Sequence, residues 1–135
     1  MMRLAAAGTA LALLGACATD RPPDPASLVQ PQALLQELAG NTLKGRSSAT
    51  ASVPFYESTD RMRFRTTILG SGQEFSDSGA ITTQGEAVCL TPDKVWDRRS
   101  FCSRYYRTPT GFRAVPTDNR PGSAMELLPG NPENL

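Results

Sequence analysis

The chemistry open to this chain is limited first by its residue types, because none of its 135 residues is a histidine. This excludes Ser-His-Asp triads, Cys-His pairs and histidine metal sites. Two carboxylate pairs, Glu57 with Asp60 and Asp93 with Asp97, fall in turn-like stretches, where Asp commonly bonds to the backbone. We therefore expect a protein that is not an enzyme and that holds neither a metal ion nor a cofactor.

Three arginines spaced two residues apart form the first candidate binding face. Arg61, Arg63 and Arg65 alternate with Met62 and Phe64, so in a β-strand the arginines project from one side and the apolar pair from the other. Guanidinium groups pair with carboxylates or phosphates, which makes an anion-binding face one interpretation. The alternative is a solvated strand face with glutamate neighbours. Arginines that could join the face are Arg98, Arg99, Arg104, Arg107 and Arg113, and the neighbouring glutamates considered are Glu57, Glu74 and Glu86.

The single tryptophan, Trp96, is the second candidate for a binding role. It lies beside Asp97, Arg98 and Arg99 in the segment between two cysteines. Aromatic residues often anchor interfaces, so Trp96 is predicted either to be an exposed contact residue or to cap the mouth of a barrel.

The N-terminal residues have the features of a bacterial lipoprotein signal. Arg3 precedes an apolar run over residues 4–14, which is well short of the roughly 20 residues that span a bilayer. The sequence Leu14-Gly15-Ala16-Cys17 then resembles a lipobox. This resemblance implies cleavage before Cys17, acylation of Cys17 and anchoring of the mature chain in a lipid bilayer. An ordinary secretory cleavage site and an uncleaved transmembrane helix are the alternatives.

The residue that follows the lipobox cysteine indicates which membrane would hold the lipoprotein. In Gram-negative lipoproteins an Asp at this position favours the inner membrane, and this chain has Ala18. The resemblance therefore implies an outer-membrane anchor with the domain in the periplasm, and the inner membrane or the cell surface is the alternative. Residues 17–30 are rich in proline and charge and are predicted to form a flexible tether.

Two cysteines, Cys89 and Cys102, remain once Cys17 is assigned to the lipid. In an oxidising periplasm this even remainder favours a disulfide. Both residues lie in predicted strands, so antiparallel pairing would bring their Cα atoms within about 4.4–6.8 Å. A redox-active dithiol or a metal site is the alternative, although the spacing is far from Cys-x-x-Cys.

Residues 31–135 are predicted to form one domain that begins with a short helix. Pro31 suits a first helical turn, where its missing N–H costs nothing. Leu34, Leu35 and Leu38 then fall on one face, and Gly40 ends the helix.

The rest of this domain has the pattern of short strands separated by turns. Stretches with β-branched and aromatic residues lie at 51–57, 61–68, 79–83, 86–90, 101–108, 112–115 and 124–128. Pro54 predicts that the first of these is an edge strand or carries a bulge. The pattern indicates a mainly β fold, a small antiparallel barrel or meander of the lipocalin-like kind, with a two-layer sandwich as the alternative.

Three short motifs resemble a group of small bacterial envelope lipoproteins and secreted domains of uncharacterised function. They are Gly40-Asn41-Thr42-Leu43, the Cys89 and Cys102 pair, and Leu127-Leu128-Pro129-Gly130-Asn131-Pro132. The similarity covers roughly residues 32–132. It implies a β-barrel-like domain and no particular activity.

Charge and size leave two classes of function. Without residues 1–16 the chain has 13 Lys and Arg residues against 13 Asp and Glu, and this balance argues against a nucleic-acid partner. The first class is a non-catalytic envelope module, inhibitor-like or structural, that binds a protein or a cell-wall component. The second is a lipocalin-like binder of a small hydrophobic or anionic ligand. A barrel interior filled by large side chains favours the first, and an apolar cavity of about 300 Å³ or more favours the second.

Overall fold

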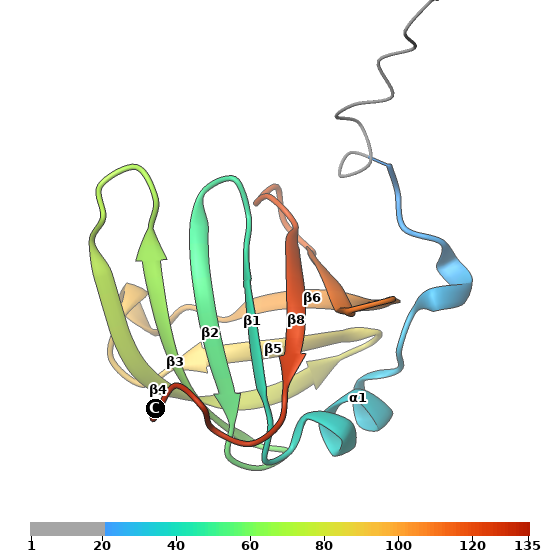
Figure 1. The fold of residues 1–135 in the computed structure, drawn as a ribbon, viewed down its shortest axis with the longest axis horizontal. Coiled ribbons are helices and arrows are strands. Elements are labelled where there is room, and N and C mark those ends of the chain that lie inside the picture. The colour runs from blue at the N-terminus through green and yellow to red at the C-terminus, as the bar shows by residue number, and fades with distance from the viewer. Residues whose placement is uncertain (1–20) are drawn as a thin grey trace, which may run out of the picture.

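The computed structural model describes residues 21–135 and shows a closed barrel of eight antiparallel strands (Figure 1). Each strand pairs with the next along the chain, and the last pairs with the first. The prediction of a mainly β, small antiparallel barrel with one short helix is confirmed. The strands are β1 (Thr42–Arg46), β2 (Thr50–Tyr56), β3 (Arg61–Ile68), β4 (Glu74–Gln84), β5 (Ala87–Pro92), β6 (Phe101–Thr108), β7 (Gly111–Pro116) and β8 (Ser123–Leu128).

Two parts of the barrel differ from the strands expected from sequence. β1 has no counterpart among them, and β4 starts at Glu74, five residues before its predicted start at Gly79. Both segments are rich in polar or small side chains, so the alternation that marks a half-buried strand is weak in them. Both segments nevertheless form strands, because hydrogen bonds to the neighbouring strands of the barrel hold them in the extended conformation.

The helix α1 (Pro31–Leu38) covers one end of the barrel, at the bottom of Figure 1. It begins with proline at its first position, as predicted, and Gly40 follows it with a positive φ of 81°. Leu34 and Leu38 are fully buried in the barrel core. A bidentate ion pair from Arg107 on β6 to Glu37, with N–O distances of 3.1 and 2.7 Å, ties the helix to the wall.

Two of the motifs that carry the family resemblance meet at this closed end. The backbone N–H of Gly130 donates to the Asn41 side chain at 3.0 Å, and the Thr42 hydroxyl donates to the Gly130 carbonyl at 2.7 Å. Thr42 is fully buried. These hydrogen bonds therefore join the segment that follows β8 to the segment between α1 and β1, so the residues of the two motifs have a structural role.

Pro54 lies inside the barrel wall, and the expectation of an edge strand or a bulge is wrong. β2 is paired on both sides, and its register with β3 is continuous from Thr50–Ile68 to Tyr56–Met62. The β1–β2 ladder joins Thr42 to Phe55 and resumes at Gly45 with Ser52, so it skips the position of Pro54. Proline has no N–H to donate, and the gap in the β1–β2 ladder accommodates it without an extra residue.

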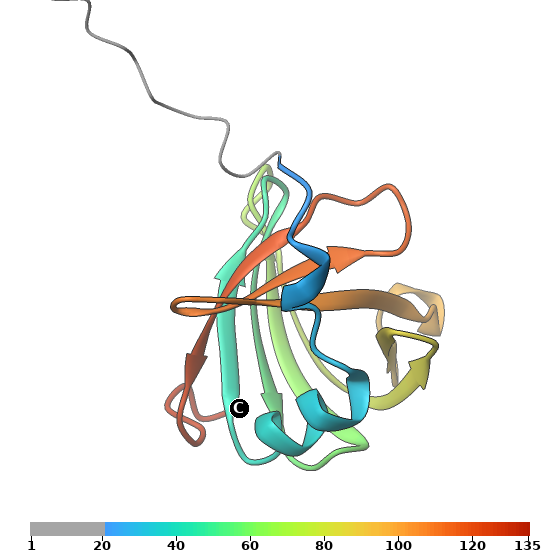
Figure 2. The same cartoon turned by 90° about the vertical axis from the view of Figure 1, so that its right-hand side faces the viewer.

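The segment before α1 packs along β6, as two perpendicular views show (Figures 1 and 2). Residues Pro25–Ser27 form a 3₁₀ turn capped by the Asp24 side chain, Leu28 bridges to Tyr106, and the Val29 N–H donates to the Tyr105 carbonyl at 2.9 Å. Ordered contacts therefore begin before residue 31, within the range predicted to be a tether. Cys17 and the predicted signal peptide lie outside the described residues.

The predicted disulfide is confirmed. Cys89 on β5 and Cys102 on β6 are directly opposite each other in the ladder and are bonded, with their Cα atoms 4.0 Å apart. This Cα separation is slightly below the expected range. Among residues 21–135, no helix has the length and apolar character needed to cross a membrane.

Candidate functional site

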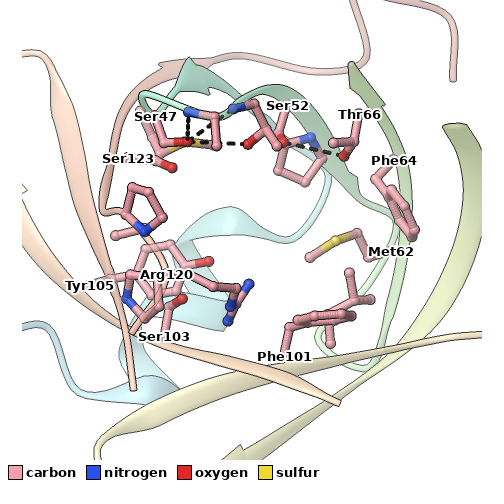
Figure 3. Close-up of a pocket in the computed structure, with 18 of the residues that line it drawn as sticks. Ser47, Ser52, Met62, Phe64, Thr66, Phe101, Ser103, Tyr105, Arg120 and Ser123 are labelled. Carbon is pink, nitrogen blue, oxygen red and sulfur yellow. Dashed lines mark hydrogen bonds between the residues drawn. The ribbon is translucent and has the colours of Figure 1, made fainter. Parts of the chain in front are cut away.

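A cavity of about 380 Å³ lies inside the barrel. Figure 3 shows it as an open space between the inward side chains of several strands. Most of the lining is apolar or aromatic, but eight of the described lining residues carry a hydroxyl group and one is an arginine. The lining residues are Ser47, Ala49, Thr50, Ser52, Pro54, Tyr56, Met62, Phe64, Thr66, Ile68, Leu90, Trp96, Phe101, Ser103, Tyr105, Ala114, Pro116, Arg120, Pro121, Ser123 and Met125.

Small inward residues leave this space empty. Alternate residues of each strand point inward, and on β2, β6, β7 and β8 these include Ser52, Ser103, Ala114 and Ser123. Larger residues at the same positions would fill the barrel with side chains, as they do around α1. The lining residues from turns, such as Ala49 and those of the β7–β8 loop, place the mouth at the end opposite α1.

Trp96 packs across the barrel interior and forms one wall of the cavity. Its ring stacks on Phe64 at a centroid distance of 5.5 Å and contacts Phe75 and Phe101 at 5.6 Å each. The side chain is half-buried. The Trp96 ring is therefore part of the cavity wall inside the barrel.

The backbone that carries Trp96 is strained. Trp96, Asp97 and Arg98 have φ values of 53°, 54° and 56°, in the left-handed region. For residues other than glycine, this conformation costs on the order of 1–3 kcal/mol each. The aromatic contacts of Trp96 compensate part of that cost and hold its ring over the cavity.

An inward carboxylate on β4 holds the start of the same loop. The Asp77 side chain accepts hydrogen bonds from the backbone N–H groups of Lys94 at 2.8 Å and Val95 at 3.1 Å. Desolvation of Asp77 acts to raise its pKa, but these backbone donors outweigh it, so the pKa lies below its ordinary value. Asp77 is therefore an ionised anchor that positions Trp96.

Arg120, in the β7–β8 loop, is the one charged residue among residues 21–135 that lines the cavity. Its Nε donates to both carboxylate oxygens of Asp118, at 2.8 and 2.9 Å, and its guanidinium lies 4.7 Å from the centre of the Phe101 ring. Figure 3 shows the guanidinium pointing into the cavity near Tyr105 and Ser103. Among residues 21–135, no hydrogen-bond acceptor is bound to its Nη1 and Nη2 atoms.

Two tyrosines, Tyr56 on β2 and Tyr105 on β6, line the cavity, and their hydroxyl groups are near enough to influence each other's pKa. Tyr56 is fully buried, and its hydroxyl has no hydrogen-bond partner within the described part of the chain. A buried polar group without a partner costs about 1–3 kcal/mol. Burial raises the pKa of Tyr56 well above its ordinary value, with a further contribution from Tyr105, and burial also raises the pKa of Tyr105. Both phenols are therefore protonated at neutral pH.

The predicted arginine face lies outside the barrel, away from the cavity. Arg61 forms a bidentate pair with Asp93, with N–O distances of 3.2 and 2.7 Å. Arg63 pairs with Glu57, one of the glutamates considered from sequence. The third residue of the face, Arg65, pairs with Glu133 at 3.1 Å. Each of the three thus has a carboxylate partner from this chain, as in the solvated-face alternative.

Sequence reasoning missed three residues of the cavity: Arg120, Tyr56 and Tyr105. Arg120 lies in a proline-containing loop without periodicity, so no local signal places it at the barrel mouth. Tyr56 could have been found, because it follows Pro54 by two residues on the inward side of β2. Tyr105 lies in the expected strand 101–108, but strand alternation alone does not tell whether Tyr105 or its neighbour Tyr106 faces inward.

Comparison of the chain with protein-family models, with curated proteins and with solved structures gave no match. The resemblance to small envelope lipoproteins therefore stays a prediction, and function is argued below from the cavity.

Proposed function

We propose that this protein is a membrane-anchored lipoprotein of the bacterial envelope whose barrel is non-catalytic and binds a small, largely apolar ligand. The observation that carries the proposal is the cavity of about 380 Å³ with apolar and aromatic walls. Ligand sites in proteins are typically apolar cavities of about 300–1,000 Å³ with a few polar groups. Of the two classes left open by the sequence, the cavity supports the lipocalin-like binder over the module with a packed interior.

The position of the N-terminal segment supports a site close to a lipid surface. The start of the described chain, blue in Figures 1 and 2, lies at the same end of the barrel as the β1–β2 turn, and Arg113 donates to the Arg21 carbonyl. From Cys17 to Arg21 an extended chain spans at most about 14 Å. Acylated Cys17 would therefore hold the mouth near the outer membrane, on its periplasmic side, where apolar ligands are concentrated.

Binding of decanol to the chain from residue 18 onward tests the proposal, because Trp96 is the only tryptophan and lines the cavity. We expect decanol to change the Trp96 emission with saturation, and calorimetry to give one site. Ala114→Phe would fill the cavity and is expected to weaken binding at least about tenfold, since a phenyl group displaces the ligand.

Ala124→Phe is the matched control, because Ala124 is exposed on the outside of β8. It should leave decanol binding unchanged. Circular dichroism shows whether the Ala114 variant is folded, and Ser123→Leu is a second cavity-filling variant if it is not. Absence of decanol binding to the wild-type protein, or equal binding by the filled and control variants, would overturn the proposal.

A further inference from the structure

The charged group of the cavity lies on one side of it. Arg120, Ser103 and Tyr105 lie together in Figure 3, opposite Met62 and Phe64, whereas the hydroxyl groups of Ser52 and Thr66 lie elsewhere along the lining. A site with a cationic group on one side and apolar side chains on the other fits a ligand that has an anionic head and an apolar tail. The proposed function accounts only for the apolar side chains and leaves the role of Arg120 open.

We propose that the ligand is an amphiphilic carboxylate whose head group is bound inside the cavity by Arg120 and the hydroxyls of Tyr56 and Tyr105. The apolar tail then packs against Met62 and Phe64. This inference rests on the proposed function and defines the ligand class of the same cavity.

The available donors favour a carboxylate. The Nη1 and Nη2 atoms of Arg120 present N–H groups in the fork geometry that matches two carboxylate oxygens. A carboxylate accepts up to about four hydrogen bonds, which the guanidinium and two phenols can supply. The charge of Arg120 is already shared with Asp118, so the site has too little positive charge to favour a dianionic phosphate.

Tyr56 is an independent reason to place the head group inside the cavity. Tyr56 lines the cavity, and its fully buried hydroxyl makes no hydrogen bond of 3.5 Å or less in the described chain, although the Tyr105 hydroxyl is near enough to act on its pKa. Burial raises the pKa of this group, which keeps it protonated and able to donate. A carboxylate oxygen would satisfy it, whereas an alkyl chain would leave it unpaired.

Comparison of decanoate, decanol and decyl phosphate at pH 8 tests the inference, because the three share one chain and differ in the head group. Titration of Trp96 emission in the chain from residue 18 onward, which contains the whole described barrel, gives each Kd. We expect decanoate to bind at least about tenfold more tightly than either of the others.

Arg120→Gln is expected to remove this preference for decanoate over decanol. Arg99→Gln is the control, because Arg99 is an exposed arginine of the β5–β6 loop that does not line the cavity. Arg99→Gln should retain the full preference.

Tyr56→Phe separates a ligand contact from a structural role. It should weaken decanoate about tenfold and decanol at most about twofold. Its Tm without ligand should not fall below that of the wild type, since no hydrogen bond within the described chain is lost. Tyr106→Phe is the control, because Tyr106 lies on the outer face of β6, and it should bind decanoate as the wild type does.

The outcomes distinguish this inference from the proposed function. Equal binding of decanol and decanoate would overturn the carboxylate site and leave the cavity as an apolar binding site. Tighter binding of decyl phosphate, or a preference that survives both Arg120→Gln and Tyr56→Phe, would also overturn it. Failure of all three ligands to bind would overturn the proposed function itself.

Discussion

Removal of the disulfide should destabilise the barrel by about 3 kcal/mol. The bond joins Cys89 to Cys102, which are 13 residues apart, and closing a loop of this length in the unfolded chain corresponds to about 3 kcal/mol. Its position adds to its importance, because the β5–β6 ladder has three paired positions and the cystine is the central one. The pairs on either side are Val88 with Ser103 and Leu90 with Phe101.

The double variant Cys89→Ala/Cys102→Ala is the perturbation, since alanine leaves no unpaired hydroxyl at the buried Cys89 position. Urea denaturation followed by circular dichroism should show the loss of about 3 kcal/mol, and thermal unfolding a Tm lower by roughly 10–15 °C. Reduction of the wild-type protein should produce a similar loss, whereas a reductant should not affect the double variant.

A loss below about 0.5 kcal/mol in the reduced wild-type protein would refute the reasoning. It would mean that the conformations of the unfolded chain between Cys89 and Cys102 are already restricted without the bond, or that the β5–β6 ladder gains stability when the bond is opened. A loss seen only in the alanine variant would assign the effect to lost packing at Cys89 rather than to the bond.

Three further outcomes are expected. An alkyne fatty acid should label the wild-type protein in cells and leave Cys17→Ser unlabelled, and equal labelling would contradict acylation at this residue. Gly45→Ala should destabilise the barrel by about 2 kcal/mol or more in urea denaturation, because an added Cβ would overlap the backbone carbonyl of Ala124 on β8. Gly122→Ala, in a loop with a wider gap, should cost less. The pKa of Glu133 is lowered by Lys44 and Arg65, so its contribution to stability is present above its unfolded pKa and is lost as the pH falls through the folded value. Glu133→Gln should therefore reduce the loss of unfolding free energy on acidification below about pH 5. If the variant loses as much unfolding free energy as the wild type over this pH range, the ion pairs of Glu133 do not stabilise the fold.

Much of the fold can be read from the chain because the signals are local. The alternation of arginines with Met62 and Phe64 defines β3 and its two faces, and the structure has the same strand bounds. Pro31 and the leucines that follow it define α1 in the same way. The cysteine pair could also be predicted, since each residue lies in a strand on either side of one turn. Period, caps and turns act within a few residues, and the sequence displays them directly.

Partners that come from distant parts of the chain were decided only by the tertiary structure. Arg65 pairs with Glu133, 68 residues away, and barrel closure joins β1 to β8. The cavity has the same origin, because Tyr56 from β2, Tyr105 from β6 and Arg120 from a loop meet only when the barrel closes around them. Strand alternation indicates which side chains face inward, but the space left among them depends on the register and curvature of all eight strands together. The sequence by itself thus determined the strands, the helix and the cysteine pair, whereas closure of the barrel decided where the candidate site lies and which groups form it.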